Sequence, residues 1–460
     1  MLALRSDNGA VQSETSGAVE PALDMLLTPE GRALVASMTP YDPASAMARL
    51  EAARAEPLWV DHPEVVAAAA TQARLRTRAA ARFPGPPRWW TPAGLEQATR
   101  PVVAARHADR FVEAGVTQVA DLGCGVGSDA VAMAAAGLQV LAVDRDPAAL
   151  RALAATAVDL GLLVTTRHGD VRTLAGPWNE PQRSDAHEGF GCFVDPARRT
   201  DAGRTRAPET WSPAWSWVRS LAERVPATGA KVAPGIDHAA VPTEAQVEWI
   251  SVGGDLVEAG VWWGPLRRGS AHRQATVLAR DDTFGAIPGS SLVTVLDDTR
   301  GIPEPRIGPV RGWLVEPDPA VIRAGLVSVL ADRITGHLVD PRIAYIVADT
   351  RPDPGPLGTT FRVVDQVPFA RKALRAELRA RGYADVVVKK RGINVVPEQL
   401  RASLHLRGAG PTATLVLTRT DAGPLALLVE RADPPSEAGR TELPVDRRAE
   451  ESGGEPGPLA

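Results

Sequence analysis

The sequence predicts an α/β protein whose centre is a parallel, doubly wound sheet. From Val116 onward, short apolar runs alternate with stretches of helical periodicity, which is typical of strand–helix–strand units. The first apolar run ends in a glycine-rich turn, Asp121-Leu-Gly-Cys-Gly-Val-Gly127, directly before a helical stretch. The chain has 460 residues, of which 44% are hydrophobic and 23% charged, so it can form roughly two or three folded domains.

The N-terminal part is expected to be helical. Residues 1–20 contain no apolar run, and we expect them to be disordered. Residues 21–110 have apolar side chains at helical spacing, such as Leu23, Leu26 and Leu27, interrupted by prolines.

The predicted sheet domain covers residues 111–280. Its expected helices begin near Asp129 and Pro147 and separate the first three strands. Seven strands are expected, at residues 118–121, 139–144, 164–170, 191–195, 230–234, 247–254 and 273–279.

A second, smaller α/β domain is expected at residues 311–432, after a connector at 281–310 broken by Gly and Pro. Its strands and helices follow one another from a helix capped by Asp318-Pro319 to a closing hairpin. The expected elements are helices at 318–332, 368–381 and after Pro397, and strands at 342–347, 385–389, 412–418 and 425–430. Residues 433–460 are rich in Pro, Gly and Glu and are expected to be disordered.

The composition excludes several classes of protein but does not indicate a binding partner. No stretch approaches the roughly 20 apolar residues of a membrane helix, and the N-terminus lacks a signal pattern, so we expect a cytoplasmic protein with no membrane partner. The two cysteines, Cys124 and Cys192, provide no disulfide framework, and no histidine has metal-ligand spacing with them, so no metal is assigned. A net charge of −4 favours no partner, and the oligomeric state is not predicted.

Glycines at 123, 125 and 127 let a ligand approach the backbone at the start of a helix. Asp144 ends the next strand about 20 residues later, where an acid can accept both hydroxyls of a ribose. Asp170 ends the third strand and is placed to receive an adenine amino group. Position 128 is Ser, so the third glycine of the dinucleotide fingerprint is absent. A nicotinamide cofactor and a turn that binds nothing remain as alternatives.

At these residues the sequence resembles the class I S-adenosylmethionine-dependent methyltransferases, whose Asp-x-Gly-x-Gly-x-Gly motif is matched from Asp121 to Gly127. The resemblance covers roughly residues 85–280. It implies a Rossmann-like seven-stranded sheet and S-adenosyl-L-methionine as cofactor. The residues that it assigns to the cofactor are Asp121, Gly123, Gly125, Gly127 and Asp144, and Asp170 joins them by its place at the end of the third strand.

A second motif, Asp195-Pro196-Ala197-Arg198-Arg199, ends the fourth strand. Methyltransferases of exocyclic amines have Asn/Asp-Pro-Pro-aromatic here, so Asp195 and Pro196 are the candidate catalytic residues. Ala197 and Arg198 depart from that pattern, although an arginine plane can stack on a base or bind phosphate, which makes Arg198 and Arg199 candidate substrate contacts. The alternative is a plain strand end with two solvated arginines.

The order of motifs is similar to the RNA cap guanine-N2 methyltransferase family, beginning at Trp89-Trp90 and Ala98-Thr99. That resemblance places Gln97 and Thr99 over the methionine end of the cofactor. The whole chain is still more similar to a bacterial group of uncharacterised methyltransferases that has Leu-Glu-Gln and Asp-Pro-Ala-Arg-Arg, matched at 95–97 and 195–199. That group has a THUMP-like C-terminal domain, which implies RNA binding by residues 310–430.

Residues 371–407 are strongly basic in a chain that is acidic overall, and three of its four lysines lie there. Such a segment can follow a phosphate backbone, which makes Lys389, Lys390 and Arg391 candidate RNA contacts; a solvated basic face is the alternative. We therefore hypothesise a methyltransferase that acts on a nitrogen of an RNA base. A catalytically silent RNA-binding protein with this fold, or a methyltransferase of small molecules or proteins, remains open.

Overall fold

The computed structural model describes residues 21–179, 188–197, 199–200, 203–205, 207–278 and 293–432. The chain divides into two compact units. The N-terminal unit comprises residues 1–304 with 317–330, and the C-terminal unit comprises residues 305–316 with 331–460. The ends expected to be disordered, 1–20 and 433–460, and part of the expected connector lie outside the described residues.

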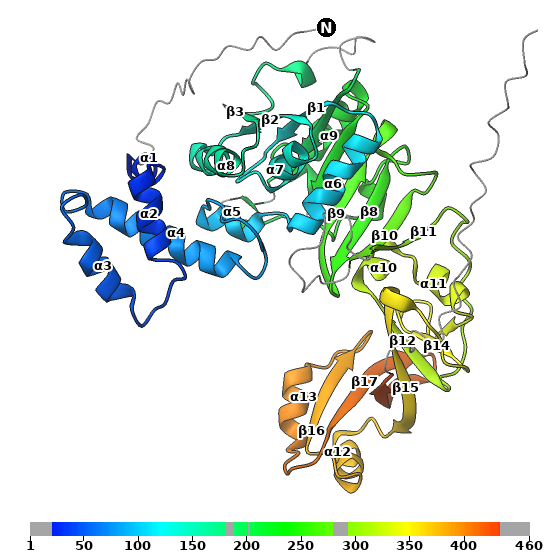
Figure 1. The fold of residues 1–460 in the computed structure, drawn as a ribbon. Helices are drawn as coiled ribbons and strands as arrows, with labels where there is room; N and C mark the ends of the chain where they lie inside the picture. Colours follow the sequence, from blue (N-terminus) through cyan, green and yellow to red (C-terminus); the bar gives the residue numbers. More distant parts are fainter. Residues whose placement is uncertain are drawn as a thin grey trace, which may run out of the picture. The chain divides into compact units, whose positions relative to one another are not determined.

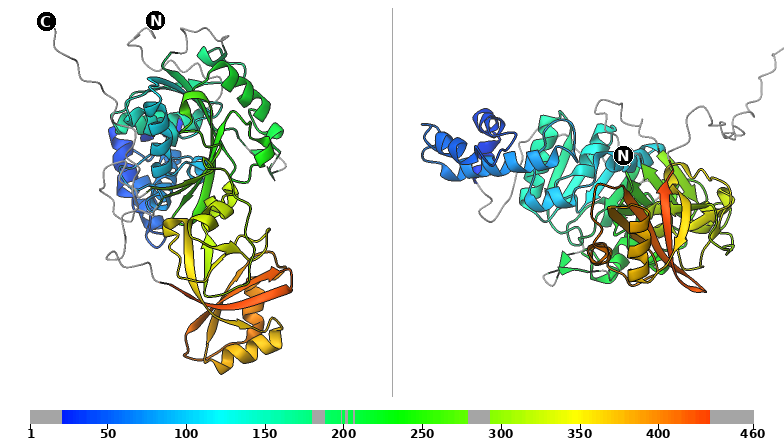
Figure 2. Two further views of the ribbon diagram at one scale, coloured as in Figure 1. Left: turned by 90° about the vertical axis from the view of Figure 1, so that its right-hand side faces the viewer. Right: turned by 90° about the horizontal axis from the view of Figure 1, so that it is seen from below.

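Four helices open the N-terminal unit (Figures 1 and 2). Prolines stand at the first position of α2 and α4, and the Thr28 side chain accepts a hydrogen bond from the Gly31 N–H, so local sequence fixes where helices begin. The apolar side chains of these helices share a core with Ala149, Ala152 and Ala155 of α8, so the helical region packs on the sheet domain. These helices are α1 (Pro21–Leu26), α2 (Pro29–Ser37), α3 (Ala46–Arg54) and α4 (Pro63–Ala79).

The sheet of the N-terminal unit confirms the predicted α/β architecture. Its strands lie in the order β11-β10-β8-β9-β7-β4-β1-β2-β3, and β1, β2, β3, β4 and β7 run parallel. Because β1 lies between β2 and β4, the chain reverses its direction of travel across the sheet at β1, where doubly wound folds bind ligands. The parallel strands are β1 (Gln118–Leu122), β2 (Gln139–Asp144), β3 (Val164–His168), β4 (Phe190–Val194) and β7 (Thr228–Val232).

Within the described residues this sheet has nine strands, two more than expected. The strand β9 pairs antiparallel with both β7 and β8, and β11 pairs antiparallel with β10. The β8–β9 hairpin turns at Gly253 and Gly254, whose φ angles of 58° and 85° suit a tight turn that only glycine pairs form readily. The four strands are β8 (Gln246–Val252), β9 (Asp255–Trp262), β10 (Arg273–Leu278) and β11 (Val293–Asp297).

The helices of the sheet domain connect these strands. Figure 1 labels α5 (Pro92–Gln97), α6 (Pro101–Glu113), α7 (Ser128–Ala135), α8 (Pro147–Asp159) and α9 (Trp215–Arg224). The expected helix at 318–332 is two helices, α10 (Pro319–Ala324) and α11 (Val327–Arg333), because Gly325 ends the first in a left-handed conformation with φ 72°.

The C-terminal unit is built on a seven-stranded sheet in the order β13-β14-β12-β15-β18-β17-β16, with α12 and α13 packed on it. The long strand β15 (Gly358–Val367) was not expected from the sequence. The other elements are β12 (Trp313–Pro317), β13 (His337–Leu338), β14 (Ile346–Ala348), α12 (Arg371–Ala380), β16 (Asp385–Lys390), α13 (Pro397–Leu404), β17 (Thr412–Thr420) and β18 (Gly423–Arg431). In neither unit does a described helix have both the length and the hydropathy for crossing a bilayer.

Candidate functional site

The glycine turn between β1 and α7 needs each glycine for a different reason. Gly123, Gly125 and Gly127 have φ angles of 88°, 54° and 73°, which other residues rarely adopt. A Cβ on Gly123 would lie 2.8 Å from the Asp195 carbonyl oxygen, and one on Gly127 would lie 2.2 Å from Leu153 Cδ1. A Cβ on Gly125 would meet nothing within 4 Å. Gly123 therefore admits the end of β4, Gly127 admits α8, and Gly125 borders open space.

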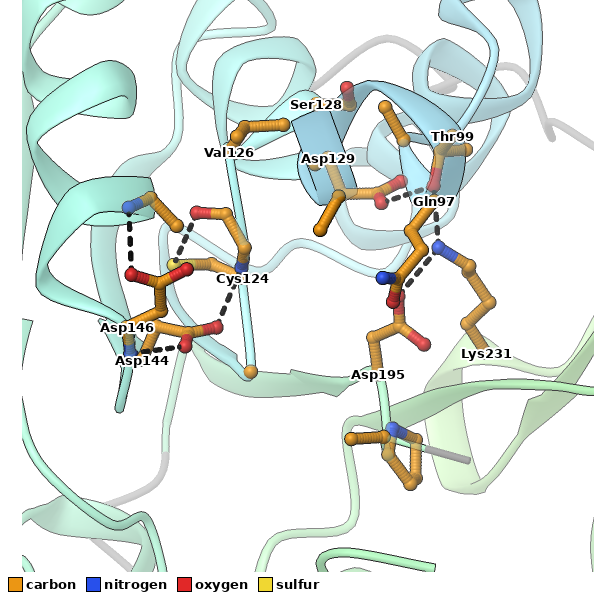
Figure 3. A pocket seen from close by; sticks show the side chains of 18 of the residues that line it. Gln97, Thr99, Cys124, Val126, Ser128, Asp129, Asp144, Asp146, Asp195 and Lys231 are labelled. Atoms are coloured by element: carbon orange, nitrogen blue, oxygen red, sulfur yellow. Dashed lines mark hydrogen bonds and ion pairs between the residues drawn. The ribbon is translucent and has the colours of Figure 1, made fainter. Parts of the chain in front are cut away.

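That open space is a cavity of about 490 Å³ at the carboxyl ends of the parallel strands. Its volume lies within the range of small-molecule sites, roughly 300–1,000 Å³. Figure 3 shows Asp144 on one side of the turn and Asp195 with Lys231 on the other. The cavity brings together eight of the candidate residues, namely Gln97, Thr99, Gly123, Gly125, Asp144, Asp170, Asp195 and Pro196.

Two backbone N–H groups hold the Asp144 carboxylate in place. Its Oδ2 accepts a hydrogen bond from the Gly125 N–H at 2.7 Å, and its Oδ1 accepts one from the Asp146 N–H at 2.8 Å. Each carboxylate oxygen has a second acceptor position, so a diol can be bound without breaking these bonds.

Asp170 is a charged acceptor at the same cavity. The Arg172 guanidinium donates from Nε to Oδ1 and from Nη2 to Oδ2, and these bonds lower the pKa of Asp170 to about 2. Asp170 is therefore ionised at any physiological pH.

The segment that follows α5 closes another side of the cavity. Gly94 of α5 packs against Val126 of the glycine turn, because a Cβ there would lie 2.2 Å from Val126 Cγ1. Arg82 donates hydrogen bonds to the carbonyls of Leu95 and Ala98, which holds the backbone on either side of Gln97. The helical N-terminal region therefore positions the two candidate residues of this segment.

Asp121 does not line the cavity, and its predicted contact with the cofactor stays a prediction. It is 1% exposed within β1, and burial raises its pKa well above the usual value of a carboxyl group. Gly127 also lies outside the lining and acts through packing.

At the end of β4, the Asp195 N–H donates to the Leu122 carbonyl at 3.1 Å, and the Asp195 Oδ2 accepts from Lys231 Nζ at 2.6 Å. Ala197 then pairs through its backbone with Ser212. Arg198 lies outside the described residues, and only the backbone of Arg199 is described, in a short strand. These two predicted contacts therefore stay predictions.

Comparisons with known proteins identify the class of this site. Residues 119–194 match the family described as "Methyltransferase domain". Two curated relatives, both uncharacterised S-adenosylmethionine-dependent methyltransferases of Mycobacterium tuberculosis strains, are 31% identical over 369 residues, which is 76% of this chain and 92% of theirs. The chain belongs to the S-adenosylmethionine-dependent methyltransferases.

Further matches cover the regions on either side of the methyltransferase sheet. Residues 358–431 match the family "THUMP domain-like", and residues 21–79 match a domain of unknown function (DUF8688). The crystal structure of a putative methyltransferase from Porphyromonas gingivalis W83 is similar in fold, with a TM-score of 0.62 and 19% identity. That similarity covers 85% of this chain and all of the other.

The sequence analysis missed a buried network that the methyltransferase builds beside Asp195. Lys231 of β7 contacts Asp195 and Thr99, and Thr99 contacts Asp129 of α7. One signal was available: Lys231 is the only lysine outside the basic C-terminal segment, and it stands in an apolar strand. Nothing along the chain linked it to Thr99, which is 132 residues away.

The structure separates the three basic residues at the end of β16 that were predicted to contact RNA. Lys389 Nζ lies 2.6 Å from Glu316 Oε2, and Arg391 Nη2 lies 3.5 Å from Glu316 Oε1, so the two share one carboxylate. Lys390 is exposed and, because side chains alternate along a strand, points to the other face. The set is therefore not one continuous cationic surface.

Two other side-chain groups bear on the site. Trp211 and Trp215 are buried and pack edge to face with ring centres 6.0 Å apart, so they belong to the core of the domain. Within the described ranges, no group of three or more His, Cys, Asp or Glu is arranged to hold a metal ion.

Proposed function

We propose that this methyltransferase transfers the methyl group of S-adenosylmethionine to a nitrogen of an RNA base. The observation that carries the proposal is the close approach of the Asp195 carbonyl to Gly123, which sets Asp195-Pro196 beside the glycine turn. An acid and a carbonyl at that place can both accept N–H hydrogens of an amine. The similarity of motif order to the cap guanine-N2 family favours an exocyclic amine.

The cavity suits the cofactor in size and in chemistry. We assign Asp144 to the ribose hydroxyls, Asp170 to the adenine amino group, and Gln97 and Thr99 to the methionine end, because all four line one cavity. Gly125 leaves the space that a nucleoside needs, since a side chain there would point into open space. When bound, S-adenosylmethionine supplies an electrophilic methyl group on a sulfonium.

The residues of this chain then have three tasks: to orient the acceptor nitrogen, to hold it in line with the methyl group and to exclude water. Asp195 and the backbone at Pro196 perform the first task by accepting the amine hydrogens. A nitrogen lone pair needs no strong base, so a carboxylate that orients the amine is sufficient.

RNA as the acceptor is supported by the THUMP-like match and by the surface of α12. Arg371, Arg375 and Arg379 follow one another at four-residue spacing and therefore share one side of the helix. None of the three forms an ion pair with another residue in the described ranges, so their charges are available to phosphates. These arginines support the proposal better than Lys389 and Arg391, whose charges Glu316 offsets.

Mass spectrometry of nucleosides tests the proposal. RNA from cells with the gene, without it, and with the gene restored as wild type, Asp195→Ala or the exposed control Asp109→Ala is digested and compared. We expect one methylated nucleoside to disappear without the gene and to return with wild type and Asp109→Ala but not with Asp195→Ala. If no RNA nucleoside changes, RNA is not the acceptor, and labelled methyl in protein or small molecules would identify another class.

A further inference from the structure

Lys231 is a buried cation at the edge of the cavity. It stands in β7 with 6% of its surface exposed, and its ammonium nitrogen lies 2.6 Å from Asp195 Oδ2 and 2.9 Å from Thr99 Oγ1 (Figure 3). Asp195 belongs to the predicted acceptor side of the cavity and Thr99 to the predicted cofactor side. A single ammonium group therefore joins the two sides.

A chain of contacts runs from this ammonium group through Thr99 into the interior of the N-terminal unit. Thr99 Oγ1 donates to Asp129 Oδ2 at 2.6 Å, and Asp129 Oδ1 lies 2.8 Å from His107 Nδ1. His107 Nε2 in turn lies 2.9 Å from Glu258 Oε1 of β9. With Thr99 as a neutral link, acidic and basic groups alternate from Asp195 to Glu258, and the charged groups come from the residue after β4 and from β7, α7, α6 and β9.

The charges in this chain of contacts stabilise one another. Burial alone lowers the pKa of Lys231, but Asp195, Asp129 and Glu258 outweigh burial and raise it, so the ammonium stays charged. His107 follows the same pattern, because Glu258 and Asp129 offset its burial and raise its pKa to about 9.

Folding does not explain why these charges are there. The other positions of β7 are buried and mostly apolar, and apolar residues of similar volume often replace a buried ion pair without loss of stability. A charged pair that also lines a cavity is a candidate for function. The second ion network of this unit, where Arg106 and Arg110 bind Glu248, does not line the cavity and provides an internal comparison.

We propose that Lys231 is a positioning residue that fixes Asp195 and Thr99 relative to each other, so that acceptor nitrogen and methyl group meet in line. This inference rests on the proposed role of Asp195 in binding the acceptor. Without the ammonium, the Asp195 carboxylate would lose its 2.6 Å contact with Lys231 Nζ, and Thr99 would lose the contact that connects it to Asp195.

Steady-state transfer of labelled methyl to total RNA from cells lacking the gene measures the effect. We expect Lys231→Met to lower kcat roughly 100-fold, the size of loss that a misplacement of about 1 Å produces, with KM for RNA nearly unchanged. Lys231→Arg keeps the charge and should recover part of kcat. Arg106→Met, which removes a buried ion pair outside the cavity, should lower thermal stability and leave kcat within about threefold of the wild-type value.

A double-mutant cycle separates positioning from a general structural role. In the Asp195→Ala background, Lys231→Met should lower kcat much less than the roughly 100-fold expected in the wild type, because Asp195 is already gone and only Thr99 is left for Lys231 to position. If the loss of kcat in the double variant equals the product of the losses in the two single variants, the inference is overturned. An unchanged kcat in Lys231→Met would also overturn it. If Lys231→Met does not fold, the same cycle with Lys231→Arg decides the question.

The double-mutant cycle also distinguishes a failure of this inference from a failure of the proposed function on which it rests. If Asp195→Ala transfers methyl to RNA as fast as the wild type, the role of Asp195 fails and the inference fails with it. If Asp195→Ala is impaired and the two effects multiply independently, only the role of Lys231 fails.

Discussion

The two units of the molecule carry their charges in opposite ways. Around the cavity of the N-terminal unit, charged side chains are buried and paired, as in Lys231 with Asp195 and His107 with Asp129. On α12 of the C-terminal unit, Arg371 and Arg379 are exposed and have no carboxylate partner among the described residues. Buried pairs have fixed geometry and are poorly screened by salt, whereas exposed charges are mobile and strongly screened. The difference suggests that the first set governs the chemical step and the second governs affinity for a polyanion.

Gly123→Ala should have the largest effect on the N-terminal unit. The new Cβ would lie 2.8 Å from the Asp195 carbonyl, so the end of β4 must move, and we expect methyl transfer to fall more than about 100-fold. Gly137→Ala is the matched control, because Gly137 has nearly the same φ of 89° but open space around its Cβ. Labelled-methyl assays with both variants measure the effect, and equal activity of the two would contradict the close approach.

The buried network should make stability depend on pH. The pKa of His107 is raised to about 9 in the folded protein, above its ordinary value of 6.5, so its stabilising effect is full below pH 6.5 and is lost as pH rises through 9. The shift corresponds to a free energy on the order of 3 kcal/mol. Denaturant unfolding of the wild type should show this decline between pH 6.5 and 9, and His107→Gln should lack it. If the free energy of unfolding of His107→Gln declines over this pH range as that of the wild type does, another group causes the decline.

Asp144→Ala should weaken cofactor binding roughly 10- to 100-fold, because the variant loses charge-assisted hydrogen bonds to the ribose. Titration calorimetry with S-adenosylmethionine measures the affinity, and Asp109→Ala on the exposed side of α6 is the control. Undiminished affinity in Asp144→Ala would remove that residue from the site.

The smallest effect is expected from the arginines of α12, of which Arg371 and Arg379 are exposed and Arg375 is half-buried. Replacing Arg371, Arg375 and Arg379 by Gln should reduce the slope of log affinity for RNA against log salt by about 2, since each phosphate contact contributes about 0.7. Fluorescence anisotropy with labelled single-stranded RNA at several salt concentrations measures the slope. The control replaces three exposed arginines of the N-terminal unit, Arg49, Arg54 and Arg219. If both triple variants change the slope equally, the arginines of α12 are not a specific RNA contact surface.

Local patterns in the sequence were sufficient to predict the parallel strands of the sheet. They also predicted which residues meet at the edge where these strands end. The glycine turn, Asp144 and Asp195 each stand at the end of an apolar run, and parallel strands bring such ends to one edge. The sequence also predicted α12 and β16 to within a few residues, because their periodicity is strong.

Contacts between distant strands were beyond the same reasoning. Lys231 meets Asp195 because β7 lies beside β4, which strand patterns alone do not specify. The burial of Asp121 was not predicted either, because it follows from the position of β1 between β2 and β4 in the middle of the sheet. β9 was missed although Gly253-Gly254, a hairpin signal, separates its apolar run from the strand before it.

Steady-state kinetics of methyl transfer to total RNA tests most directly whether buried charges govern chemistry and exposed charges govern affinity. The two proteins to compare are Asp195→Ala and the triple Gln variant of α12. We expect Asp195→Ala to lower kcat with little change in KM for RNA, and the triple variant to raise KM with kcat preserved. The opposite assignment, or equal effects of both variants on kcat, would contradict the account.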